Sequence, residues 1–178
     1  MNKKIFYNPF YFIAGYKALL FGIVGFIITC ILAYKTGTHF NGLLNIDFAK
    51  DSDLWVYFLE NFSFWIISSI CFYFAGIILS KSKIRLIDIL GTTLLSRLPL
   101  IITPLFRIIP IFQSFGFYSF QLFFLVFIYI ASLIWTIILL YNSYKVSCNL
   151  KNIQLNISFI ICLLLSEVLT KVLIHIII

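Results

Sequence analysis

Charged side chains are scarce in this chain: of its 178 residues, 11% are charged and 62% are hydrophobic. So few polar groups cannot cover the surface of a water-soluble globule of this length. The mean hydropathy of +1.09 agrees with the composition. A soluble globular domain is therefore excluded, and we expect lipid to be the solvent for most of the surface.

The sequence also lacks the motifs of common enzyme and metal sites. It contains no HExxH, no GxSxG and no glycine-rich phosphate loop, and His39 and His175 lie far apart. The four cysteines have no CxxC spacing, and a free Cys in an apolar stretch packs as a small hydrophobe. The segment with Asp47, Asp51 and Asp53 lacks the glycine and the final Glu of an EF-hand loop. We predict a protein that is not an enzyme and has no catalytic residue, cofactor or metal site.

Long apolar stretches predict an all-α integral membrane protein, a single domain over residues 1–178 with about five transmembrane helices. Because a spanning helix needs about 20 apolar residues, this length leaves no room for a separate soluble domain. The predicted spans are residues 18–34, 54–79, 86–106, 120–141 and 155–178. Residues 35–53 are polar and rich in turn formers, so we expect them to form the largest loop, solvated outside the hydrocarbon.

The basic residues predict the orientation of this bundle. One side would receive Lys3, Lys4, Lys17, Lys81, Lys83, Arg85, Lys145 and Lys151. The other side would receive Lys35, Lys50 and Arg107. The positive-inside rule then places the N-terminus in the cytoplasm and the C-terminus outside. This topology explains the net charge of +7, so we expect the lipid bilayer and other membrane proteins as partners, and no nucleic acid.

The first predicted span carries small side chains on one face. Gly22 and Gly25 recur with Ala18 and Thr29 at spacings of three or four, which places all four on the same side of a helix. Small residues let two helices approach closely inside a membrane. We therefore expect Gly22 and Gly25 to face another helix.

The third predicted span has the composition of a kinked helix. It contains Gly91, Pro99 and Pro104. Each proline removes a backbone hydrogen-bond donor and crowds the preceding turn. We expect this span to be the least regular of the five.

Arg97 and Glu167 lie inside predicted spans, where an unpaired charge is costly. They are eleven and twelve residues past the starts of their spans, so both reach a similar depth near the bilayer midplane. We predict that they pair, either as a structural clamp or as a step in proton or anion transport. Lys171 follows Glu167 at i+4 and is the alternative partner of its carboxylate.

Three local patterns match one known family of membrane proteins. They are Asn8-Pro9-Phe10 before the first span, Gly91-Thr92-Thr93-Leu94-Leu95 leading to Leu98-Pro99-Leu100, and Trp135 before a short polar link. With five spans and a cytoplasmic N-terminus, the chain resembles the Yip family, the Ypt/Rab-interacting membrane proteins, in the broad sense that includes bacterial members. It lacks the acidic cytoplasmic region and the Asp-Leu-Tyr-Gly-Pro motif of eukaryotic members, so GTPase binding and vesicle traffic are not carried over. The resemblance implies a non-enzymatic protein, expected in a bacterial cytoplasmic membrane.

Two functions are compatible with these expectations. The first is a scaffold that organises other membrane components, and the alternative is a small transporter or channel that uses the polar residues of spans three and five. Transport predicts a water-accessible cavity around Arg97, Thr92, Thr93 and Glu167, whereas a scaffold predicts that these side chains are packed without water. The sequence carries no signal for an oligomeric state.

Overall fold

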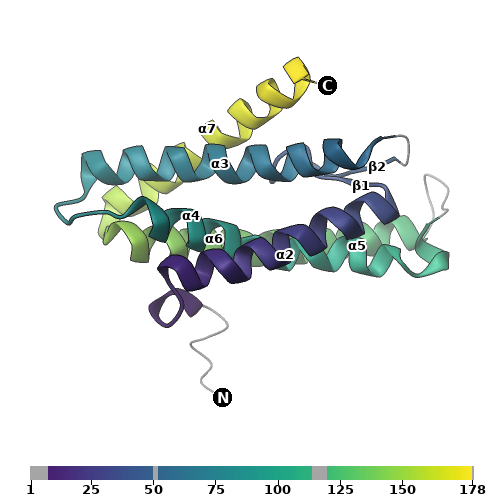
Figure 1. The fold of residues 1–178 in the computed structure, drawn as a ribbon, viewed down its shortest axis with the longest axis horizontal. Coiled ribbons are helices and arrows are strands. Elements are labelled where there is room, and N and C mark those ends of the chain that lie inside the picture. The colour runs from purple at the N-terminus through teal and green to yellow at the C-terminus, as the bar shows by residue number, and fades with distance from the viewer. Residues whose placement is uncertain (1–7, 50–51, 114–119, 178) are drawn as a thin grey trace.

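The computed structural model describes residues 8–49, 52–113 and 120–177, which form an all-α bundle (Figure 1). Its long helices are α2 (Gly15–Thr36), α3 (Leu54–Leu79), α6 (Phe120–Cys148) and α7 (Asn152–Ile177). A fifth apolar segment consists of α4 (Leu86–Ser96), the short 3-10 helix η2 (Leu98–Ile101) and α5 (Ile102–Arg107). Each of these five units is long and apolar enough to cross a membrane. The prediction of an all-α bundle with five apolar helices is confirmed.

The remaining elements are short. Two 3-10 helices, η1 (Pro9–Tyr11) and η3 (Pro110–Phe112), precede α2 and follow α5. Two strands of two residues each, β1 (Thr38–His39) and β2 (Asp47–Phe48), lie between α2 and α3.

The third apolar segment is broken where its prolines require it. Helix α4 ends at Ser96, and Pro99 lies in the first turn of η2, where its missing N–H leaves no bond unmade. Pro104 is likewise within the first turn of the short helix α5. In the most apolar 18-residue stretch of this segment, 67% of the residues are buried, whereas the share in the other spans is at most 39%. The irregular segment is therefore the central one of the bundle.

Helix α2 packs closely against this central segment. The ideal Cβ position of Gly22 lies 2.9 Å from the Leu94 side chain, and Gly25 lies against Leu98. Across the same contact, Gly91 lies so near α2 that an added Cβ would be 2.7 Å from the backbone oxygen of Gly15. Gly22 and Gly25 thus face another helix. On that partner helix, the absence of a side chain at Gly91 allows the backbone of α2 to approach closely.

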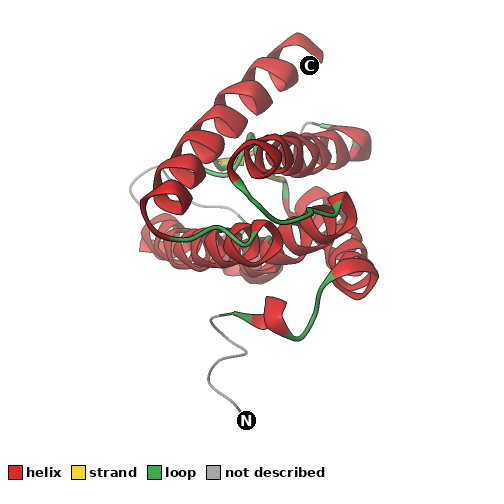
Figure 2. Cartoon of the chain, turned by 90° about the vertical axis from the view of Figure 1, so that its left-hand side faces the viewer, coloured by secondary structure: helices red, strands yellow, loops and turns green. Residues whose placement is uncertain are grey.

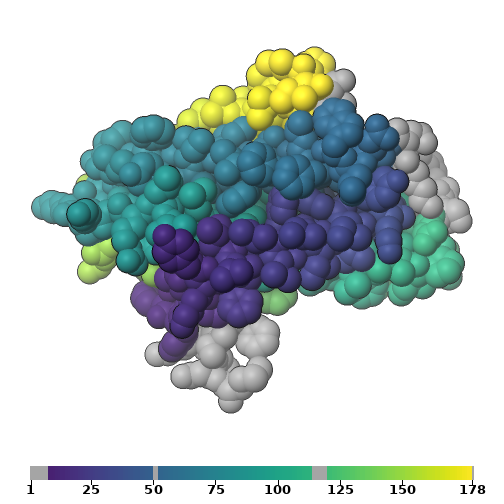
Figure 3. All heavy atoms as spheres, in the orientation of Figure 1, coloured from purple at the N-terminus to yellow at the C-terminus, as the bar shows by residue number. Residues whose placement is uncertain are grey.

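Helices α3 and α7 pack against each other. Phe72 of α3 stacks on Tyr144 of α6 at 4.8 Å between ring centroids and on Phe159 of α7 at 5.8 Å. The end view in Figure 2 shows α7 crossing the other helices at an angle, with its C-terminal half standing away from them. In the space-filling view, α2 and α3 lie side by side along one face and the end of α7 rises above α3 (Figure 3).

The segment between α2 and α3 is folded into the end of the bundle. Strands β1 and β2 pair antiparallel with Thr38 opposite Phe48. The tip of this hairpin carries Phe40 and Leu43, which are 0% and 1% exposed. The expectation of a solvated loop is therefore wrong for residues 37–40, 42 and 43, which are buried and whose backbone finds partners inside the bundle, whereas Leu44, Asp47 and Ala49 are exposed.

Candidate functional site

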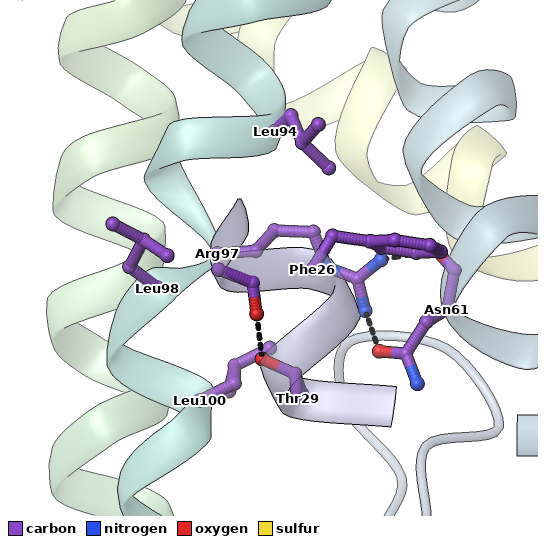
Figure 4. A pocket seen from close by; sticks show the side chains of 8 residues that line it. Phe26, Thr29, Asn61, Leu94, Arg97, Leu98 and Leu100 are labelled. Carbon is purple, nitrogen blue, oxygen red and sulfur yellow. Dashed lines mark hydrogen bonds between the residues drawn. The ribbon is translucent and has the colours of Figure 1, made fainter. Parts of the chain in front are cut away.

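Arg97 lies at the C-terminal cap of α4 with its side chain inside the bundle, where it is 7% exposed. Its guanidinium donates hydrogen bonds to the backbone oxygen of Asn61 and, at 3.2 Å, to the Asn61 side-chain oxygen. The same guanidinium lies 4.9 Å from the ring centroid of Phe64. Figure 4 shows the side chain reaching from the central segment toward Asn61. Arg97 thus joins the central segment to α3.

The predicted ion pair of Arg97 with Glu167 is not formed. Arg97 has no carboxylate within 4 Å among the residues that the structure describes, and its polar partners there are the two oxygens of Asn61. Similar depth along two helices does not determine which faces of those helices the two residues occupy. Asn61 on α3 takes the place that the sequence analysis gave to Glu167.

A small cavity adjoins Arg97, lined also by Gly25, Thr29, Asn61 and Leu98 among others (Figure 4). Its volume is about 10 Å³, close to the minimum that holds one water molecule. The Arg97 Nε group is buried and has no hydrogen-bond partner among the described residues. One water fits this place, but a hydrated path does not.

Thr92 and Thr93, which lie about one helical turn before Arg97 in α4, connect helices directly. The Thr92 hydroxyl accepts a hydrogen bond from Ser143 of α6 at 2.7 Å, and the Thr93 hydroxyl lies 2.6 Å from that of Ser69 on α3. Such hydroxyl contacts tie transmembrane helices together, each by about 0.6 to 2 kcal/mol. This layer is therefore packed side chain to side chain.

Glu167 binds the segment between α2 and α3 instead of Arg97. Its carboxylate accepts the backbone N–H of Leu43 at 2.7 Å and that of Leu44 at 3.3 Å. Lys171, one turn further along α7, lies 3.4 Å away. The local partner that the i+4 spacing offered is thus present, together with two backbone donors that the sequence did not reveal.

Glu60 of α3 also forms hydrogen bonds to the segment between α2 and α3. One carboxylate oxygen lies 2.7 Å from Nδ1 of His39, and the other accepts the backbone N–H of Phe40 at 3.0 Å. Because the carboxylate acts as an acceptor toward Phe40 as well, we assign the hydrogen of the first bond to Nδ1 of His39. The His39 ring also stacks on Tyr57 at 4.2 Å.

Two further side chains complete this attachment. Arg107 donates to the backbone oxygen of Gly37 at 2.8 Å and to the Thr38 hydroxyl at 3.1 Å. The Tyr129 hydroxyl on α6 donates to the backbone oxygen of Leu43 at 2.6 Å. Four side chains form hydrogen bonds to residues 37–44, and we call them the anchoring residues: Glu60, Arg107, Tyr129 and Glu167. They come from four different spans, so the hairpin links most of the bundle at one end.

A pocket of about 520 Å³ opens beside the hairpin. The hairpin, the start of α3 and the end of α7 line it with polar side chains that include His39, Asp47, Glu60, Lys171 and His175. His39 is 6% exposed, and its Nε2 atom is buried with no hydrogen-bond partner among the residues that the structure describes.

Metal ligands do not converge in this region. Within residues 8–49, 52–113 and 120–177, no group of three or more His, Cys, Asp or Glu side chains is arranged to hold a metal ion. The four cysteines are free thiols, three of them buried.

Comparisons of the chain with protein-family models, with curated proteins and with solved structures find no match. Function is therefore inferred from the geometry alone, and the resemblance to the Yip family stays a prediction.

Proposed function

We propose that this chain is a non-enzymatic membrane scaffold, which organises other membrane components through the outer faces of its helices. The observation that supports this role is the close packing around Arg97. Its cavity holds about one water, and Thr92 and Thr93 are bonded to neighbouring helices rather than to an aqueous path. The polar groups of the third span thus serve to join helices, as the scaffold hypothesis requires.

We further propose the bacterial cytoplasmic membrane as the location, with the N-terminus inside. The basic loops support this orientation. At the proposed cytoplasmic end, a pocket of about 440 Å³ is lined by Lys81, Lys151 and several neutral polar side chains. Lysines at such a position attract anionic lipid headgroups, each by about 1 kcal/mol near the membrane surface. The Yip family remains our proposal for the relationship of this protein.

A small transporter is the second candidate, and the pocket beside the hairpin favours it. That pocket reaches Glu60 and His39, so polar groups do lie behind an opening at one end of the bundle. However, the residues that line it and those that line the Arg97 cavity have no member in common. The two spaces are therefore separate.

Photocrosslinking in native membranes tests the scaffold directly. A photoreactive amino acid at Ile78, which is 77% exposed, should give crosslinked species of discrete mass with other membrane proteins. The same amino acid at Phe72, which is 0% exposed, is the matched control on the same helix and should give none. Scanning further exposed positions, Phe74 and Ile70, extends the test over the face.

The rival function is tested in proteoliposomes. The scaffold predicts solute and ion flux equal to that of protein-free vesicles. Flux that depends on the protein and falls in Arg97→Met or Thr92→Val would contradict the scaffold and establish transport. Lipid-only crosslinks from every exposed position would also overturn the scaffold proposal.

A further inference from the structure

We infer that the pocket at the basic end of the bundle binds the phosphate group of one anionic phospholipid, with Lys81 and Lys151 as its cationic partners. The site rests on the proposed membrane location and not on the scaffold role. Its failure in a lipid titration would therefore leave the crosslinking test of the scaffold unaffected.

Two loops that are far apart in the sequence form this pocket. One follows α3 and the other joins α6 to α7, and together they contribute Leu79, Ser80, Lys81, Ser82, Asn149, Leu150, Lys151 and Asn152, with Gln154 from the start of α7. Both loops lie at the end of the bundle opposite the hairpin (Figure 1), and Figure 2 views the bundle from this end. The two lysines thus come from separate loops but line one pocket, so a phosphate bound there lies in the field of both charges.

The charge of the pocket is uncompensated. Lys81 and Lys151 are exposed, and neither forms an ion pair with a carboxylate of the described residues. The lining residues that the structure describes include no acidic side chain, and Asp88, the nearest acidic residue along the chain, is bound to Arg85 at 2.7 Å. Residues 1–7, outside the described part of the chain, contain two lysines and no acidic residue. The pocket therefore favours an anion.

Neutral hydrogen-bond donors accompany the two lysines. The side-chain amides of Asn149, Asn152 and Gln154 belong to exposed residues that line the pocket, and each amide carries two N–H donors. The loop after α3 is held in a turn because the Ser80 hydroxyl accepts the backbone N–H of Ser82 at 3.1 Å. Ammonium groups and amide donors together suit a charged group with several acceptor oxygens, such as a phosphate.

The apolar surface beside the pocket favours a lipid over a soluble phosphate. Ile78 directly precedes the lining residue Leu79 and is 77% exposed, and Ile153 lies between two lining residues and is 71% exposed. Side chains of this kind at the ends of membrane-spanning helices face acyl chains. The pocket volume of about 440 Å³ is within the range of about 300 to 1,000 Å³ usual for small-molecule sites. A phospholipid contacts both the pocket and the isoleucines, whereas a soluble phosphate contacts only the pocket.

Calorimetric titration of the full chain in a nonionic detergent tests the site with three ligands at constant ionic strength. Dioctanoyl phosphatidylglycerol should bind saturably at one site per chain. Dioctanoyl phosphatidylcholine has the same chains and a phosphate but no net charge, and it should bind about tenfold more weakly or worse. Glycerol 3-phosphate has the phosphate without the chains and should also bind about tenfold more weakly or worse. No saturation with phosphatidylglycerol, or equal binding of either of the other two ligands, would overturn the inference.

Charge variants separate this pocket from the basic end of the bundle as a whole. Lys81→Gln and Lys151→Gln should each weaken phosphatidylglycerol binding about fivefold. Lys151→Arg keeps the charge and should bind within about twofold of the unaltered protein. Lys145→Gln removes the same charge at the same end, but Lys145 is not among the lining residues, so the affinity should change less than about twofold. Equal losses in Lys145→Gln and Lys151→Gln would mean general attraction of anionic lipid and would overturn the pocket as the site.

Native mass spectrometry of protein extracted from bacterial membranes gives an independent measurement. The unaltered protein and Lys145→Gln should retain one anionic phospholipid per chain after mild removal of detergent. The double variant Lys81→Gln with Lys151→Gln should lose it. Retention of the same anionic lipid by the double variant, or of zwitterionic lipid alone by the unaltered protein, would contradict the site.

Discussion

The carboxylate of Glu167 accepts the backbone N–H of Leu43 at 2.7 Å, across 124 positions of the chain. The backbone curls around this carboxylate so closely that a Cβ on Gly42 would lie 2.6 Å from both of its oxygens. A charged acceptor on α7 thus satisfies backbone donors of a segment that enters the bundle without regular secondary structure. Since backbone groups inside a membrane protein must find such partners, Glu167 is a condition for the buried position of the hairpin tip.

Replacing Glu167 should therefore destabilise the fold. In Glu167→Gln, the amide keeps the shape but loses the charge, and it turns a donor toward one of the two N–H groups, of Leu43 and Leu44, that bond to different carboxylate oxygens. We expect a loss of about 2–3 kcal/mol in the free energy of unfolding. Lys171→Met is the control and should cost less than about 1 kcal/mol, because the lysine side chain is half exposed. Unfolding in mixed detergent micelles measures both, and equal losses would contradict the role of the backbone bonds.

Gly42 should tolerate no side chain. Its φ of 122° is a conformation that side chains disfavour, and the space where a Cβ would lie is filled by the Glu167 carboxylate. Gly42→Ala should cost about 1–3 kcal/mol and expose the hairpin tip to solvent. Gly37→Asn is the control, since Gly37 has a φ of 62° that asparagine adopts readily. Hydrogen exchange of the Leu43 amide should become faster in Gly42→Ala and stay slow in Gly37→Asn.

The transmembrane helices could be predicted from the sequence because length and hydropathy determine them. Residues 54–79 were predicted with the bounds that α3 has, and the proline-broken third span followed from Pro99 and Pro104. The ends of α6 and α7 were less accurate, since polar residues near Lys145 are compatible with a helix that extends out of the bilayer.

The buried partners could not be predicted, for two physical reasons. The position of a residue along a helix can be estimated from sequence spacing. The direction in which its side chain points across the bundle depends on how all the helices pack. Glu167 was therefore predicted as the partner of Arg97, in place of Asn61. The polar composition of residues 35–53 also predicted a segment in water. The sequence did not reveal that Glu60, Arg107 and Glu167 supply hydrogen bonds to part of this segment inside the bundle.

Glycines at the contact between α2 and α4 should differ in sensitivity. A Cβ on Gly91 would meet backbone atoms of α2, the Gly15 oxygen at 2.7 Å and the Leu19 nitrogen at 2.8 Å, which can move only if the helices separate. A Cβ on Gly22 would meet the flexible side chain of Leu94. We expect Gly91→Ala to lower stability by about 2 kcal/mol and Gly22→Ala by about 1 kcal/mol or less.

The leucine variants Gly22→Leu and Gly25→Leu should both lower the thermal stability in detergent, because neither larger side chain fits between α2 and the central segment. Thermal unfolding followed by circular dichroism measures the series. A Gly91→Ala variant as stable as the unaltered protein would contradict the backbone contact.

The orientation of the chain can be tested with fusions at two positions. If the basic loops lie in the cytoplasm, a fluorescent protein fused after Ile178 should stay dark when exported, and alkaline phosphatase fused there should be active. The same reporters placed after Lys151, in the link between α6 and α7, should give the reverse result. A C-terminal fluorescent protein that is bright in cells would contradict five spans with the N-terminus inside.

The partner of Arg97 should be measurable by two double-mutant cycles on one arginine. Arg97→Met combined with Asn61→Leu removes both members of a hydrogen-bonded contact, so the two changes should couple by about 1 kcal/mol. Arg97→Met combined with Glu167→Leu alters residues that bind different partners, so the effects should add within about 0.5 kcal/mol. The coupling to Asn61 is expected to be modest because Arg97 also binds the Asn61 backbone oxygen, which no side-chain substitution removes. Unfolding free energies of the six proteins in the same detergent provide both values. A larger coupling energy with Glu167 than with Asn61 would mean that Arg97 and Glu167 form an ion pair, and would contradict the contact between Arg97 and Asn61 of α3.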